Sequence, residues 1–69
     1  MRIIINGKDY QVQGGRMSYT NLTAIAGYHE LDRPTVIFDN RGFRGNLYYG
    51  TSVELSDGMQ ITINNRGAL

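Results

Sequence analysis

The sequence contains no cysteine and no tryptophan, and only one proline and one histidine among its 69 residues. The absence of cysteine excludes disulfide bonds, thiolate metal sites and a cysteine nucleophile, and small secreted scaffolds usually depend on disulfides. No apolar run approaches the roughly 18 to 20 residues that span a bilayer, and residues 1–10 lack the apolar core and cleavage site of a signal peptide. We therefore expect a cytoplasmic protein with no membrane partner.

Neither sign of charge dominates the sequence. Seven basic and six acidic side chains give a formal net charge of +1. Because these charges are scattered along the chain, charge alone does not suggest nucleic acid or an anionic membrane as a partner. A chain of this length buries only about 60 % of the surface that its unfolded form exposes. We expect one domain with a core of modest depth and no large active-site cleft.

The start of the sequence predicts a β-hairpin. Residues 2–6 are rich in β-branched side chains, and Asn6-Gly7 supplies the positive φ angles of a tight hairpin turn. Residues 9–13 alternate between polar and apolar, as a half-buried strand does. The alternation places Ile4 on the face that carries polar neighbours, so we expect Ile4 to point outward.

A helix is predicted after this hairpin. Ser18 can cap its first turn, and Gly27 can end it in a left-handed conformation. Because the segment contains two threonines and one asparagine, its intrinsic propensity is mediocre, and its helicity should depend on packing against the hairpin. Apolar side chains recur at spacings of three and four and form one stripe about three turns long: Tyr19, Leu22, Ile25 and Ala26.

The second half of the sequence predicts further strands and turns. Pro34 favours an extended entry into a strand at residues 35–39. Residues 40–46 are expected to form a polar loop with glycines at both corners, and residues 47–49 a short edge strand. Asp57-Gly58 marks a turn before a final strand at residues 59–64, which alternates cleanly.

Together these elements predict an α+β fold in which a four- to five-stranded mixed sheet packs on one helix. The domain covers residues 1–64, and residues 65–69 form a C-terminal tail. The first hairpin and the final strand alternate most strongly, which favours central positions for them. If the final strand lies parallel beside the first, the sheet wraps the helix as a β-grasp. A small SH3-like barrel is the alternative, but it has no use for such a helix after its second strand. The expected core is Ile3, Ile5, Val12, Leu22, Ile25, Ala26, Val36 or Phe38, Leu55, Met59, Ile61 and Ile63.

Residue types suited to catalysis are sparse. His29 is the only histidine, and Glu30 is its neighbour in sequence rather than a partner placed across a site. The sequence shows no paired carboxylates, no metal-ligand spacing and no phosphate-binding glycine loop. We therefore expect no enzyme activity, no catalytic residue, no metal site and no cofactor.

One short segment is similar to a nucleic-acid-binding motif. Residues 41–45 read RGFRG, like the arginine-glycine segments that follow RNA backbones, and Tyr48 and Tyr49 could stack on bases nearby. The alternative is an exposed loop that Phe43 anchors to the core. The small net charge favours this loop, because affinity for phosphates depends on several neutralised charges. We do not expect nucleic acid as a partner.

Three segments of the sequence carry a resemblance to a known family. Residues 3–10 read IIINGKDY, residues 18–27 read SYTNLTAIAG and residues 50–63 read GTSVELSDGMQITI. They are similar to ubiquitin-like β-grasp proteins, in particular to the bacterial multiubiquitin type of ubiquitin-related domain. The resemblance spans nearly the whole chain, although its motifs are mainly structural. It implies a β-grasp fold and a role as a protein modifier.

The resemblance also assigns a role to the C-terminal residues. Ubiquitin-like modifiers end in a flexible tail whose terminal glycine carboxylate is adenylated with ATP by an activating enzyme, passed on as a thioester and joined to a target amine. Arg66-Gly67 resembles the end of such a tail, but there is no Gly-Gly and the chain continues with Ala68-Leu69. A processing peptidase would have to remove these two residues. The partners implied are this peptidase, the activating and conjugating enzymes and the target protein.

Two other functional hypotheses are compatible with this fold. A sulfur carrier needs a terminal Gly-Gly thiocarboxylate, which the sequence lacks. A non-covalent interaction module would leave the tail inert and bind its partner through an apolar patch on the outer face of the sheet. Lys8, the only lysine, would be the side-chain amine for self-conjugation if the chain is a modifier, and is otherwise a solvated turn residue. The candidate patch residues are Ile4, Ile37 or its neighbour Val36, Tyr48 and Tyr49.

Overall fold

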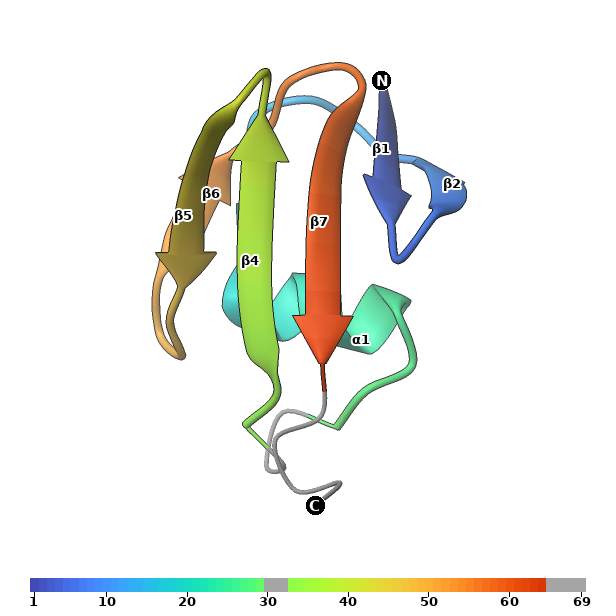
Figure 1. Ribbon diagram of the computed structural model, residues 1–69. Coiled ribbons are helices and arrows are strands. Elements are labelled where there is room, and N and C mark those ends of the chain that lie inside the picture. The colour runs from blue at the N-terminus through green and yellow to red at the C-terminus, as the bar shows by residue number, and fades with distance from the viewer. Residues whose placement is uncertain (30–32, 65–69) are drawn as a thin grey trace.

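The computed structural model describes residues 1–29 and 33–64 of the chain (Figure 1). Within these residues lie seven strands and one helix. In chain order they are β1 (Arg2–Ile5), β2 (Lys8–Gln11), β3 (Arg16–Ser18), α1 (Tyr19–Ile25), β4 (Thr35–Asn40), β5 (Phe43–Leu47), β6 (Ser52–Glu54) and β7 (Met59–Asn64).

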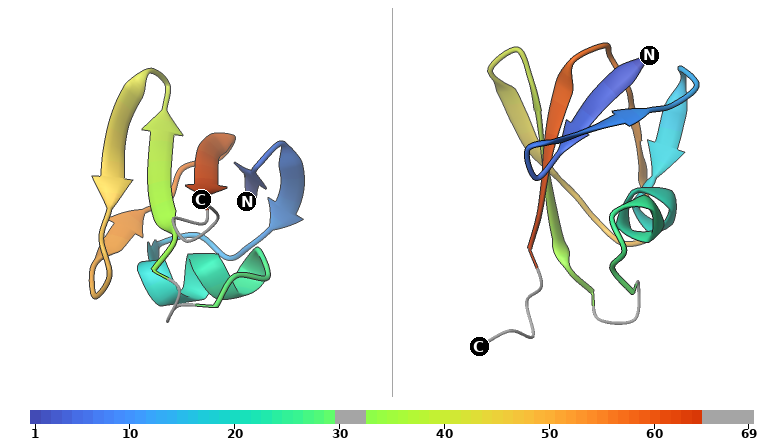
Figure 2. Two further views of the ribbon diagram at one scale, coloured as in Figure 1. Left: turned by 60° about the horizontal axis from the view of Figure 1, so that its bottom comes forward. Right: turned by 90° about the vertical axis from the view of Figure 1, so that its right-hand side faces the viewer.

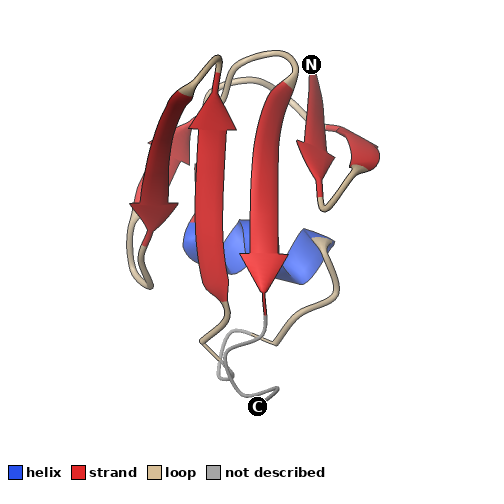
Figure 3. Cartoon of the chain, in the orientation of Figure 1, coloured by secondary structure: helices blue, strands red, loops and turns tan. Residues whose placement is uncertain are grey.

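Five of the strands form a mixed sheet in the order β2-β1-β7-β4-β5, and β3 and β6 form a separate antiparallel pair. Strands β1 and β7 are parallel, whereas the other neighbours in the five-stranded sheet are antiparallel. Helix α1 lies across one face of this sheet (Figures 2 and 3). The predicted α+β class, the mixed sheet and the final strand beside the first are confirmed. The prediction of a central position is wrong for β2, which forms an edge.

The β1–β2 hairpin forms as its sequence predicts. Asn6 and Gly7 both have positive φ angles, of 52° and 81°, as a two-residue hairpin turn of this type requires. The Asn6 side chain also reaches β7: its Oδ1 accepts a hydrogen bond from Ile63 N at 2.9 Å, and its Nδ2 donates to Ile63 O at 3.1 Å. The side chain of this turn residue therefore ties the first hairpin to β7.

Helix α1 begins where it is predicted to begin but is shorter. The Ser18 side chain accepts a hydrogen bond from Asn21 N at 3.1 Å, and Gly27 follows the helix with a φ of 84°. Ile25 is 37 % exposed, so its prediction as a core residue is wrong. The buried face of the helix is centred on Tyr19, Leu22 and Thr23, and Ile25 lies to the side of that face.

The core between the sheet and the helix contains most of the predicted residues. Val36 rather than Phe38 takes the fully buried position on β4, and Phe38 packs at the margin together with Val12 and Ala26. Leu47 is buried although it was not expected in the core. The buried apolar residues are Ile3, Ile5, Tyr19, Leu22, Val36, Leu47, Leu55, Met59, Ile61 and Ile63.

The prediction of a polar loop at residues 40–46 is wrong, because this segment forms a second hairpin. Arg41 and Gly42 have φ angles of 55° and 88°, so they form the same kind of turn as Asn6-Gly7. Strand β5 ends at Leu47, and the predicted edge strand at 47–49 is absent from the described chain. Phe43 is 73 % exposed and does not anchor the segment to the core.

Candidate binding site

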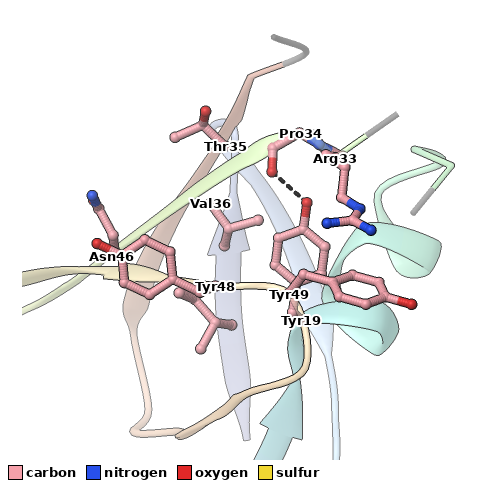
Figure 4. A pocket seen from close by; sticks show the side chains of 9 residues that line it. Tyr19, Arg33, Pro34, Thr35, Val36, Asn46, Tyr48 and Tyr49 are labelled. Carbon is pink, nitrogen blue, oxygen red and sulfur yellow. Dashed lines mark hydrogen bonds between the residues drawn. The ribbon is translucent and has the colours of Figure 1, made fainter. Parts of the chain in front are cut away.

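A pocket of about 460 Å³ opens where β4 begins and β5 ends (Figure 4). Three segments that are distant in sequence meet there: the first residue of α1, the entry into β4, and the end of β5 with the residues that follow it. The residues that line the pocket are Tyr19, Arg33, Pro34, Thr35, Val36, Asn46, Leu47, Tyr48 and Tyr49.

One wall of the pocket consists of two tyrosine rings and a guanidinium group. The buried Tyr19 hydroxyl donates a hydrogen bond to the Pro34 carbonyl oxygen at 2.5 Å, which ties α1 to the start of β4. The Tyr49 ring meets the Tyr19 ring edge to face, with centroids 5.8 Å apart and planes at 75°. Arg33 lies over the Tyr49 ring, with Cζ 4.3 Å from the centroid. Buried Tyr19 therefore positions the ring of the more exposed Tyr49, and the Tyr49 ring in turn positions the Arg33 guanidinium.

The opposite wall is formed by Tyr48 and Asn46 (Figure 4). The buried side chains of Val36 and Leu47 form the apolar floor of the pocket. Tyr48 is 66 % exposed. Its position depends on a tight turn, in which Tyr48 N donates to Thr51 Oγ1 at 3.2 Å and Thr51 N donates to Tyr48 O at 3.0 Å. This turn presents two exposed tyrosines, one to each side of an apolar floor.

Arg33 gives the pocket a positive rim. Within the described residues the ion pairs are Arg2 with Asp9 at 3.6 Å and Arg44 with Asp39 at 3.7 Å, both on the sheet and away from the pocket. The Arg33 backbone has a φ of 51°, which for a non-glycine residue is an uncommon conformation. The arrangement can hold an apolar group between the tyrosine rings and pair an anionic group with Arg33.

The structure does not bring the four predicted patch residues together. Ile4 and Ile37 are half-buried on the sheet face opposite α1, on strands β1 and β4. Strand β7 lies between them and places Gln60 beside Ile4 and Thr62 beside Ile37. Tyr48 and Tyr49 lie at the pocket instead. Strands β7 and β4 therefore separate Ile4 from the tyrosines, whereas Ile37 is the cross-strand partner of the pocket residue Asn46.

Arg33 and Asn46 are pocket residues that sequence reasoning missed. Asn46 was assigned to a loop, and nothing local in the sequence indicates that residues 33–34 meet residues 48–49. That meeting depends on the β4–β5 hairpin, whose register pairs Val36 with Leu47. Recognition of Arg41-Gly42 as a two-residue turn would have predicted this pairing, because such a turn fixes the register of the strands on either side.

The remaining predicted site residues lie away from the pocket or outside the described residues. Lys8 is exposed at the start of β2, with Nζ 5.8 Å from the centroid of the Tyr10 ring. Arg66, Gly67, Ala68 and Leu69 fall outside the described residues, and the strand that precedes them, β7, ends at Asn64.

No helix in the ranges 1–29 and 33–64 is long and apolar enough to cross a membrane. In the same ranges no three side chains of histidine, cysteine, aspartate or glutamate gather as the ligands of a metal ion would. No family model, curated protein or solved structure matches the chain.

Proposed function

We propose that the chain is a ubiquitin-like β-grasp protein modifier, whose Gly67 carboxylate is activated with ATP and joined to a target amine. The observation that carries this proposal is the sheet order β2-β1-β7-β4-β5 with β1 and β7 parallel at its centre and one helix across a face. A β-grasp has this order of hairpin, helix and returning central strand, and the resemblance of residues 3–10, 18–27 and 50–63 points to the same family.

The position of β7 suits a modifier because the C-terminal residues follow directly from a well-anchored strand. Ile61 and Ile63 of β7 are buried, and the Asn6 side chain is hydrogen-bonded to both the N–H and the C=O of Ile63. The residues from Asn64 to Gly67 can reach at most about 13 to 14 Å. Gly67 has no Cβ, so a narrow enzyme channel can admit it and its carbonyl carbon is open to attack.

The proposed reaction begins with hydrolysis of the Gly67–Ala68 peptide bond, which frees the Gly67 carboxylate. This carboxylate attacks the α-phosphorus of ATP and releases pyrophosphate, and a cysteine thiolate of the activating enzyme then displaces AMP to form a thioester. A target amine attacks the thioester, an amide bond forms, the amine loses a proton and the enzyme thiol is released. The chain has no cysteine, so every thiol in this sequence of steps belongs to a partner enzyme.

Expression of an N-terminally tagged chain in cells of its source organism tests the proposal. We expect intact mass spectrometry of the purified protein to show loss of Ala68-Leu69, and heavier adducts that survive reducing agent. Gly67→Val should abolish the adducts because the branched side chain hinders the tail in the enzyme, whereas Asn65→Ala should leave them. Recovery of only the chain that ends at Leu69, with no adduct, would refute the proposal.

A second candidate function, non-covalent docking, is favoured by the two exposed tyrosines at the pocket. Tyrosine supplies a large contact area at a low cost in side-chain entropy, which suits an interface. Deletion of residues 66–69 separates the two functions. Conjugation should be lost in the truncated chain, whereas docking should be retained.

A further inference from the structure

The β5 edge of the five-stranded sheet offers unpaired backbone groups. In the β4–β5 hairpin the two-residue turn makes Asn40 and Phe43 a hydrogen-bonded pair, and such pairs alternate along the ladder. The N–H and C=O groups of Arg44 and Asn46 therefore point away from β4. Strand β5 is the last in the sheet order, so among the described residues no strand lies on that side.

The two edges of the sheet differ in how well they are blocked. Strand β2 carries Asp9, which pairs with Arg2 at 3.6 Å, and also Lys8, and charged side chains on an edge, lysine above all, discourage pairing with another chain. Strand β5 carries no proline and no lysine, and its first residue, Phe43, exposes 73 % of its surface. Arg44 is the only charged residue of β5, and it pairs with Asp39 of the neighbouring strand at 3.7 Å. The β5 edge is thus the more receptive of the two.

Asn46 joins this edge to the tyrosine pocket. Its backbone groups belong to the open edge, and its side chain lines the pocket beside Tyr48 (Figure 4). A peptide strand that pairs with β5 would therefore place the side chains that follow its contact with Asn46 over the pocket. There the floor of Val36 and Leu47 between two tyrosines fits an apolar side chain, and the Arg33 cation fits a carboxylate.

We propose that the β5 edge and the tyrosine pocket together bind one extended, acidic peptide segment of a partner protein. The segment adds a strand beside β5, seats an apolar side chain between Tyr48 and Tyr49, and pairs an aspartate or glutamate with Arg33. The unpaired backbone groups of β5 favour a peptide over a small molecule. The positive charge of Arg33 favours a peptide with an acidic side chain. This inference rests on the docking function and is independent of conjugation through Gly67.

Selection from a phage-displayed library of random dodecapeptides on the immobilised full chain tests the inference. We expect the enriched sequences to share an apolar residue next to an aspartate or glutamate within an extended, proline-free stretch. A synthetic peptide of the most enriched sequence is then titrated into the protein by fluorescence anisotropy. Tyr48→Ala and Arg33→Gln should each weaken its binding by about tenfold or more, and Gly67→Val should leave it unchanged.

The strand-addition part of the inference has its own variants. Arg44→Pro removes one outward N–H without removing a donor from the β4–β5 ladder, and proline is tolerated on an edge strand. We expect it to weaken peptide binding about tenfold, while Arg44→Ala, which loses the ion pair with Asp39 but keeps the N–H, changes binding less than about threefold. Gln11→Pro removes an outward N–H from the opposite edge and should have no effect. Circular dichroism checks that each variant is folded.

Three results would overturn the inference. The first is a failure to enrich any peptide, and the second is enrichment of peptides that bind independently of Tyr48, Arg33 and the Arg44 N–H. If the Ile4→Asp substitution weakens the binding of such peptides instead, docking stands as a function but uses the sheet face that carries Ile4. The third is a concentration-dependent dimer in analytical ultracentrifugation that Arg44→Pro abolishes, because this would assign the β5 edge to a second copy of the chain.

Discussion

Replacement of Asn6 tests the contact that joins the first hairpin to the central strand β7. The Asn6 side chain accepts a hydrogen bond from Ile63 N at 2.9 Å and donates one to Ile63 O at 3.1 Å, while its backbone holds a φ of 52°. Asparagine therefore serves two purposes at this position. It tolerates the left-handed turn conformation, and it extends the parallel β1–β7 pairing with side-chain atoms.

The two purposes can be separated by their magnitudes. Each hydrogen bond contributes about 0.5 to 1.5 kcal/mol, so losing both costs about 1 to 3 kcal/mol. Asn6→Gly loses the hydrogen bonds but keeps the turn conformation at no steric cost. Asn6→Ala loses the hydrogen bonds and also puts into the left-handed region a residue that tolerates this conformation less well than asparagine, which adds roughly 1 kcal/mol. We expect Asn6→Ala to lower the free energy of unfolding by about 2 to 4 kcal/mol, and Asn6→Gly by less.

Equilibrium urea unfolding followed by circular dichroism measures these differences, provided that the m-values of the variants agree. Asn6→Asp is an informative third variant, because it keeps the acceptor for Ile63 N and replaces the donor to Ile63 O. It should therefore fall between the wild type and Asn6→Ala. An Asn6→Gly variant as stable as the wild type would show that the bonds to Ile63 contribute nothing. Equal stability of the glycine and alanine variants would refute the strain argument.

Three further substitutions test other contacts by the same measurement. Gly45→Ala places a Cβ 2.6 Å from Phe38 Cζ, so we expect a loss of about 1 to 3 kcal/mol. Gly14→Ala, whose Cβ meets only a methionine side chain at 3.5 Å, is its matched control and should be nearly neutral. Ser18→Ala removes the cap of α1 and should cost about 1 kcal/mol, whereas Ser18→Asn should restore most of it. Tyr19→Phe removes a buried hydrogen bond to the chain before β4 and should cost about 1 to 2 kcal/mol, and an unchanged stability would contradict that role.

The parts of the fold that the sequence predicts correctly have local signals. Asn6-Gly7 marks a two-residue turn, and Ser18 and Gly27 mark the ends of a helix. Arg41-Gly42 forms a similar turn, but arginine rarely takes a positive φ, so the sequence around it is typical of a loop. Strands β3 and β6 pair two short segments that are far apart in sequence, and three residues are too few to establish a period.

Non-local packing also explains what sequence reasoning missed in the core and at the pocket. Gly45 fits a strand because the ring of Phe38 from β4 occupies the space above it, and a lone glycine gives no sign of that contact. The exposure of Tyr48 and Tyr49 agrees with their prediction as surface residues, but their separation from Ile4 depends on strand order. Arg33 reaches Tyr49 because the start of β4 lies beside the end of β5. The role of Gly67 stays a prediction from the resemblance.

The most direct test of the modifier proposal is a search for the chain's C-terminal remnant on target proteins. Trypsin cleaves after Arg66, so conjugation through Gly67 would leave a single glycyl group on a target lysine. Samples must be prepared without iodoacetamide, whose adduct on lysine has the same mass. We expect glycyl-lysine peptides in digests of tagged-chain adducts, and their loss in cells that express Gly67→Val. Such a peptide at Lys8 would show self-conjugation. Adducts without any glycyl-lysine peptide, or glycyl-lysine peptides that persist in Gly67→Val cells, would contradict the proposal.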